Sequence, residues 1–217
     1  MVSGGGRAVE VPPGRLAGWF DRFAERNDGV LSTELSPRRV VVTGGDGTTA
    51  TVDVPFAPLA GEGARPGLDV GPLIEHVGRP WLIGLLLVRL GGHSVGLARA
   101  GSVVVSRTDR RLVHGRNAAG GWSQQRFARR RAGQARQALR AAAGDALDVL
   151  GPRLSEVDAV VLGGDRRALD ELREDVRLAP IFARAEPRVL DVSEPRRSVL
   201  EDAAERAISV EIVVRGG

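Results

Sequence analysis

Apolar residues near the start of the chain recur with the period of a helix. Leu16, Trp19, Phe20 and Phe23 share one face at about 100° per residue, and prolines stand just before them. A proline at the start of such a pattern is a helix-start signal. The pattern therefore predicts a helix over residues 12–27.

Alternation replaces the helical period in the next segments. Residues 39–43 and 49–56 alternate and are β-branched, with GGDGT between them, which predicts a hairpin. GGDGT resembles the phosphate-binding motif of NAD and lipid kinases, where it opens onto a helix. Here a strand-like segment follows it, so the hairpin is favoured over the kinase site. Residues 57–71 are rich in Pro, Gly and Ala and are expected to be a linker or boundary.

Three strand-like segments follow a short helical segment at 72–77. Residues 81–90, 93–100 and 102–107 are joined by tight turns that contain glycine, so an antiparallel meander is predicted. The stretch 108–121 is expected to be a loop.

The last third of the chain alternates between helix and strand. A long helix is predicted over 122–150, because Gly151 and Pro152 end it. The elements expected after it are a strand at 157–164, a helix from Asp165, a strand at 188–192, a helix from Glu194 and a strand at 209–214.

These elements predict an α/β fold. An antiparallel meander followed by β/α units gives a mixed sheet with helices on its faces. The predicted division is a small N-terminal α+β extension at residues 1–70, made of a helix and a β-hairpin, and a second domain at residues 71–217.

Composition excludes several classes of site. The chain has no cysteine, so a disulfide framework or a thiolate metal site is impossible. The histidines at 76, 93 and 114 are dispersed, so no metal or cofactor is expected; His76 and His93 are interpreted as structural. The N-terminus shows no apolar signal region, and the longest apolar run, 81–88, is too short for a bilayer. We therefore expect a cytoplasmic protein with no membrane partner.

Positive charge is concentrated in one segment. All 31 basic residues are arginine. Residues 110–140 hold nine arginines and no acid, a net charge of +9, whereas residues 1–109 are balanced and residues 141–217 carry −5. Such a local basic patch indicates an anionic partner.

The long helix places this charge on one face. At about 100° per residue, Arg126, Arg129, Arg130, Arg136 and Arg140 fall within an arc of roughly 120°. Most of the apolar residues of the helix fall opposite. An ordinary solvated face is the alternative to nucleic-acid contact. However, the helix contains no acid before Asp145 that could pair with these arginines, and arginines near a helix N-terminus gain nothing from the helix dipole. Contact with a phosphate backbone is therefore favoured.

The segment that opens this helix, GGWSQQRFAR at 120–129, resembles a known motif. Class-1 release factors of the archaeal and eukaryotic type carry GGQ, continued as GGQSAxRFxR. The two glycines, the serine and RFAR align here, but Trp122 takes the place of the glutamine, and Gln124 and Gln125 follow. With this displaced glutamine the chain resembles the Vms/ANKZF-like release factors (VLRF family), in its actinobacterial-type branch. The resemblance extends over residues 75–217.

The resemblance implies a fold, an activity and partners. It implies the RNase H-like central domain of release factors and a peptidyl-tRNA hydrolase that frees nascent chains on stalled ribosomes. The partners would be the acceptor end of peptidyl-tRNA and the large ribosomal subunit. The implied catalytic residues are Gly120, Gly121, Gln124 and Gln125, and of the two glutamines Gln124 is favoured. The expected RNA-binding residues are Arg110, Arg111, His114, Arg116, Trp122, Arg126, Arg129, Arg130, Arg136 and Arg140.

Other interpretations of the motif stay open. Relatives that cut tRNA near its CCA end suggest a nuclease, and release-factor paralogues without the glutamine suggest a non-catalytic ribosome- or RNA-binding factor. The glutamine pair would then be two polar residues in a first helical turn. A metal-dependent RNase H nuclease is not favoured, because residues 81–90 and 93–100 contain no carboxylate. VLGGD at 161–165 resembles a Rossmann strand end but lacks G-x-G-x-x-G, so Asp165 is expected to cap a helix.

Overall fold

The structure is a computed structural model that forms two compact units. It describes the backbone of residues 6–89, 92–110 and 122–217, and the side chains of these ranges except 110 and 122–132. One unit comprises Met1–Pro80 and Ile208–Gly217, and the other comprises Trp81–Ala207. The boundary thus lies ten residues beyond the predicted one, and the end of the chain belongs to the first unit.

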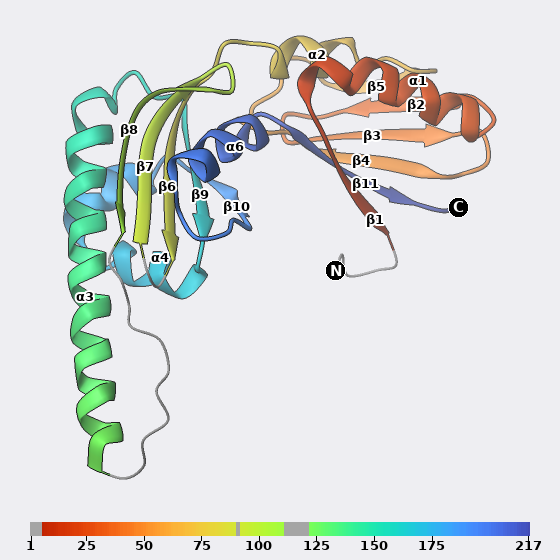
Figure 1. Cartoon of the computed structure of the whole chain (residues 1–217). Helices are drawn as coiled ribbons and strands as arrows, with labels where there is room; N and C mark the ends of the chain where they lie inside the picture. Colours follow the sequence, from red (N-terminus) through yellow and green to blue (C-terminus); the bar gives the residue numbers. More distant parts are fainter. Residues whose placement is uncertain (1–5, 90–91, 111–121) are drawn as a thin grey trace. The chain divides into compact units, whose positions relative to one another are not determined.

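The first unit contains one antiparallel sheet and two helices (Figure 1). The helices are α1 (Leu16–Arg26), which a 3-10 turn at Pro13–Arg15 precedes, and α2 (Gly71–Val77). The strands, in their order across the sheet, are β1 (Arg7–Val11), β11 (Val210–Arg215), β4 (Thr49–Asp53), β3 (Arg39–Gly44), β2 (Val30–Leu35) and β5 (Gly63–Pro66).

Periodicity explains the core of this unit. Leu16, Phe20 and Phe23 are buried on α1, as the helical spacing predicted. They pack with alternate residues of the sheet, such as Val42 and Val52. The burial of one face of α1 and alternate positions of the strands is the pattern of a helix layer on a sheet.

The predicted hairpin at GGDGT is confirmed. β3 and β4 pair antiparallel, with Thr43 opposite Thr49. Within the turn, Asp46 accepts hydrogen bonds from the backbone N–H of Thr48 at 2.9 Å and from its hydroxyl at 3.0 Å. The Asp46 carboxylate thus serves the turn, as it does in ordinary hairpins.

Two sequence expectations for this unit were wrong. The predicted linker at 57–71 contains β5, whose Arg65 lies opposite Thr33 of β2. The strand expected at 209–214 was assigned to the second domain, but β11 pairs with β1 and β4 of the first sheet. Val210 and Ile212 are fully buried in the core of the first unit, which explains why the chain returns there.

The second unit has a mixed five-stranded sheet. β6, β7 and β8 form the predicted antiparallel meander, while β9 runs parallel to β6 and β10 parallel to β9. The strands, in their order across the sheet, are β10 (Ala185–Leu190), β9 (Ala159–Gly164), β6 (Leu82–Arg89), β7 (Gly92–Arg99) and β8 (Ser102–Arg110).

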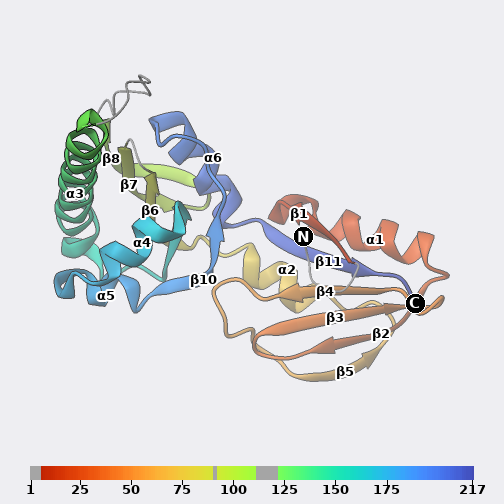
Figure 2. The same ribbon diagram turned by 90° about the horizontal axis from the view of Figure 1, so that it is seen from below.

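Helices cover both faces of this sheet (Figure 2). On one side lie α3 (Trp122–Leu150), α4 (Arg166–Arg173) and α5 (Ala179–Phe182), with 3-10 turns at Gly151–Arg153 and Val176–Leu178; on the other lies α6 (Arg197–Ala207).

Close packing fixes some residue choices in this unit. A Cβ at Gly96 of β7 would come within 2.9 Å of Leu200 of α6 and of the Val105 carbonyl oxygen, so only glycine fits there. Asp165 caps α4 as predicted, accepting from the backbone N–H groups of Arg167 and Ala168. Among the described residues, no helix is long and apolar enough to cross a bilayer.

Candidate nucleic-acid interface

Helix α3 carries most of the residues that the sequence singles out. It runs from Trp122 to Leu150, as predicted, and its 29 residues correspond to a length of about 44 Å. Figure 1 shows its C-terminal part against the sheet and its N-terminal part continuing past the ends of the strands. The helix therefore holds its first turns away from the body of the second unit.

The C-terminal part of α3 packs through small side chains. Ala142, Ala143, Ala146 and Leu150 are buried in the core of the second unit, and Leu139 is packed against the edge of that core. These positions recur at helical spacing, so one stripe of the helix faces the sheet. The apolar face predicted for the helix is confirmed where side chains are described.

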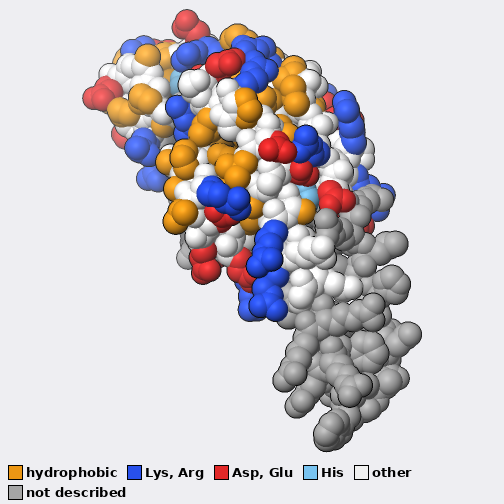
Figure 3. Space-filling view, turned by 90° about the vertical axis from the view of Figure 1, so that its left-hand side faces the viewer, with side chains coloured by type: hydrophobic (Ala, Val, Ile, Leu, Met, Phe, Trp, Pro, Cys, Tyr) orange, Lys and Arg blue, Asp and Glu red, His pale blue; other side chains and the backbone are white. Residues whose placement is uncertain are grey.

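The opposite stripe of α3 is basic and exposed. Arg136 and Arg140 are both exposed, and neither takes part in an ion pair among the side chains that the structure describes. Figure 3 shows basic side chains in a row beside atoms that are not described. Because no acid occurs between residues 110 and 140, the segment itself supplies no carboxylate to neutralise this charge, which favours attraction of anions.

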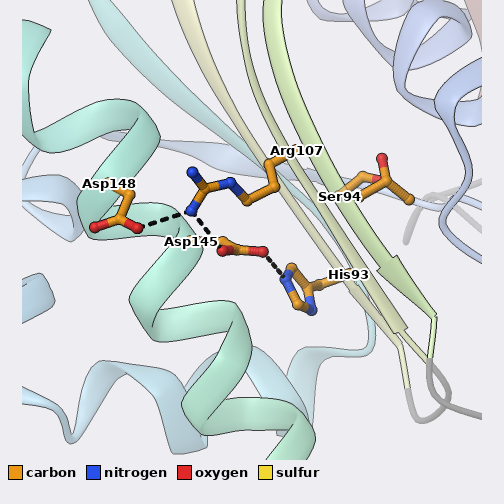
Figure 4. Close-up of polar contacts among 6 residues, drawn as sticks. His93, Ser94, Arg107, Asp145 and Asp148 are labelled. Carbon is orange, nitrogen blue, oxygen red and sulfur yellow. Dashed lines mark hydrogen bonds and ion pairs between the residues drawn. The ribbon is translucent and has the colours of Figure 1, made fainter.

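A polar cluster fastens α3 to the sheet (Figure 4). Asp145 of α3 lies between His93 of β7 and Arg107 of β8. The distance from Asp145 Oδ2 to His93 Nε2 is 2.8 Å, and from Asp145 Oδ1 to Arg107 Nη1 it is 2.9 Å. Arg107 Nη1 also donates to Asp148 Oδ2 at 2.7 Å. Both oxygens of the Asp145 carboxylate are therefore engaged with neighbouring strands.

The charges in this cluster stabilise one another. Burial raises the pKa of Asp145, but the hydrogen bonds from His93 and Arg107 outweigh it and bring the pKa below the ordinary 3.8. The hydrogen bonds to Asp145 and Asp148 raise the pKa of Arg107. Since an ionised carboxylate only accepts, the His93 Nε2 carries the proton of the hydrogen bond to Asp145.

The structure describes the side chains of some predicted site residues, only the backbone of others, and nothing of the rest. The residues with described side chains are Arg136 and Arg140. The backbone of Arg110 ends β8, and the backbones of Trp122, Gln124, Gln125, Arg126, Arg129 and Arg130 lie in the first turns of α3. Gly120, Gly121, Arg111, His114 and Arg116 lie outside the described residues.

Sequence reasoning did not identify the polar cluster as part of the site. His93 was expected to be structural, and it is buried, with 2% exposure, against Asp145. A usable signal was present, because Asp145 is the first acid after a run of nine arginines. Its partners lie 52 and 38 positions away in the sequence, so their contact depends on the fold. The described residues contain no group of His, Cys, Asp or Glu that could hold a metal ion.

Comparison with known proteins gives a family match and similar solved structures. Residues 82–213 match the family described as the Actinobacteria/chloroflexi VLRF1 release factor. A solved archaeal protein is 14% identical with a TM-score of 0.41, over 89% of this chain and 69% of that chain. The archaeal translation termination factor aRF1 is 15% identical with a TM-score of 0.44, over 93% of this chain and 66% of that chain.

Proposed function

The chain belongs to the Actinobacteria/chloroflexi VLRF1 release factor family, and from this premise we propose that it is a peptidyl-tRNA hydrolase. It frees nascent chains from peptidyl-tRNA on stalled ribosomes, in the cytoplasm. The observation that carries the proposal is the sequence GGWSQQ at the N-terminal end of α3, within the matched region. The antiparallel meander followed by parallel strands supports an RNase H-like fold for the second unit.

The chemistry of the loop suits ester hydrolysis by positioning. Glutamine does not titrate at any relevant pH and cannot act as a general base. Its amide can hold a water against the ester carbonyl, while backbone N–H groups face the developing oxyanion. Gly120 and Gly121 would let the backbone approach the substrate closely. We assign the water-positioning role to Gln124, with Gln125 as the second candidate.

The position of α3 supports this assignment. Gln124 stands 15 positions before Leu139, the first residue of α3 with a described side chain that packs against the core, which is about 22 Å along the helix. A helix that extends this far past its sheet can enter a narrow, RNA-lined site while the rest of the unit stays outside. The peptidyl-transferase centre of the large subunit is such a site.

The basic stripe supplies affinity for RNA. Arg136 and Arg140 are exposed and face solvent on the same helix as the glutamines. Guanidinium groups bind phosphates through paired hydrogen bonds and attract them over longer range. With the other arginines of residues 110–130 they would hold the tRNA acceptor end, and Trp122 and His114 would stack on unpaired bases.

Analysis of the products tests the proposal. Stalled ribosomes that carry labelled peptidyl-tRNA are incubated with the full chain. Free peptide and a tRNA with an intact CCA end are the expected products. Peptide that still carries terminal nucleotides would show CCA-end cleavage instead. Ribosome binding without any release would show a non-catalytic factor, and either result would contradict ester hydrolysis.

A further inference from the structure

The middle of α3 packs on the sheet mainly through small side chains. Ala142, Ala143 and Ala146 are buried there, whereas the larger Val149 and Leu150 are buried at the C-terminal end of the helix. Helices lock against their neighbours when side-chain ridges enter grooves. Alanine methyl groups form shallow ridges, so they permit close approach but resist rotation and sliding weakly.

The polar cluster adds directional contacts that fix the rotation and register of α3. Two strands are tied to two helix residues one turn apart: His93 and Arg107 bind Asp145, and Arg107 also binds Asp148. His93 is 2% exposed and the Asp145 side chain 18% exposed. Hydrogen bonds are directional, so the buried contact between His93 and Asp145 favours one rotation and one register of α3, and the more exposed Arg107 adds to it.

We propose that His93, Arg107 and Asp145 are positioning residues that fix the direction of α3 and thereby the place of its N-terminal end in the substrate complex. The inference rests on the proposed function, because it concerns the delivery of Gln124 to the ester. We call these three residues the helix clamp.

Because α3 is long, a small tilt at the helix clamp produces a large displacement of its N-terminal end. Gln124 stands 21 positions before Asp145, a lever of about 32 Å, so a tilt of about 10° at the clamp would move Gln124 by about 5 Å. A misplacement of about 1 Å in a reacting group costs about 100-fold in rate. A small loosening of the clamp is thus sufficient to slow a positioning-based reaction by about 10- to 100-fold.

Distance measurement tests the clamp independently of catalysis. The chain has no cysteine, so spin labels attach only to introduced ones. Gly133→Cys is suitable on α3, because an added Cβ meets no neighbour there, and Val104→Cys is suitable on β8, because Val104 is 53% exposed. We expect a narrow label-to-label distance distribution in the wild-type background, and a broader or shifted one with Asp145→Asn or Arg107→Ala.

A matched control separates the clamp from a general loss of charge. Arg197→Ala removes an ion pair with Glu201 that lies within α6 alone, at 3.0 Å, and should leave the distribution unchanged. Arg107→Gln is the milder variant and keeps the test valid if Asp145→Asn unfolds the protein. Unchanged distributions in folded Arg107→Ala and Arg107→Gln proteins would overturn the proposal.

Release kinetics provide the second measurement. Arg107→Ala should lower the single-turnover rate of peptide release by about 10- to 100-fold, while ribosome binding stays near the wild-type value. Equal loss of binding and rate would indicate a merely structural role and would overturn the proposal. If wild-type protein releases no peptide, the proposed function fails, and the distance measurement still decides whether the clamp sets the direction of α3.

Discussion

At the level of single residues, Asp145 is the residue of α3 that binds side chains of both β7 and β8. It is mostly buried, with 18% of its side chain exposed, yet its pKa lies below the ordinary value because His93 and Arg107 bind its charged form. A buried carboxylate that keeps its charge needs such partners. Removing Asp145 leaves His93 buried at 2% exposure without its hydrogen-bond acceptor.

The first prediction concerns pH and Asp145. Asp145→Asn should lower the free energy of unfolding at pH 7 by about 1–3 kcal/mol, the usual cost of unpairing buried polar groups. Because the native pKa of Asp145 is depressed below 3.8, the stabilisation is complete above the unfolded pKa and is lost as pH falls through the native value. Urea unfolding of both proteins from pH 7 downward measures this difference. A difference that does not shrink at acid pH would contradict the assigned charge state.

The elements that carry His93 and Asp145 were predicted from the sequence, but the contact between the two residues was not. The alternation in residues 93–100 predicted a strand that includes His93, and the helical pattern predicted a helix that includes Asp145. The two residues meet because β7 and α3 pack together 52 positions apart. Periodicity assigns a residue to a face of its own element, but it does not say which residue of another element lies opposite.

At the scale of elements, α3 was predicted most closely. Its apolar stripe is long and regular, and Gly151 and Pro152 end it sharply. β1, β2 and β5 were missed. β1 and β5 are largely exposed and their sequences carry little alternation, whereas the alternate burial of Thr33 and Leu35 on β2 was not recognised. β5, with sequence GARP, is a strand because β2 pairs with it. A strand of this kind is defined by its partner.

The prediction for α3 concerns salt. Each arginine that contacts a phosphate contributes about 0.7 to 0.9 to the slope of log K against log salt. Arg136→Ala/Arg140→Ala should therefore weaken binding to deacylated tRNA and make that slope shallower by about 1.4 to 1.8. Titrations by fluorescence anisotropy at several salt concentrations measure the slope.

A charge-matched control belongs to the same experiment. Arg177→Ala/Arg197→Ala removes two exposed arginines that pair with Asp175 and Glu201. This variant should keep the wild-type slope, because its arginines are already neutralised by carboxylates. Equal slopes for all three proteins would show that the stripe on α3 is an ordinary solvated face.

At the level of the whole molecule, the chain forms two compact units, and the first of them includes the end of the chain, Ile208–Gly217. A helix and a β-hairpin at residues 1–70, followed by a second domain at 71–217, were expected from the sequence. The last strand was predicted correctly but assigned to the wrong sheet, because SVEIVV alternates as any half-buried strand does. Alternation does not identify the sheet that a strand joins. The family match covers residues 82–213 and so includes the segment around Gln124.

The proposed role of Gln124 is tested by the rate of peptide release in a single turnover. Stalled ribosome–peptidyl-tRNA complexes are mixed with excess wild-type, Gln124→Ala or Arg197→Ala protein. We expect release by wild type and Arg197→Ala at equal rates. For Gln124→Ala we expect a rate about 100- to 1000-fold lower, the usual cost of removing a group that stabilises the transition state. Release by Gln124→Ala at the wild-type rate would contradict the role given to this glutamine.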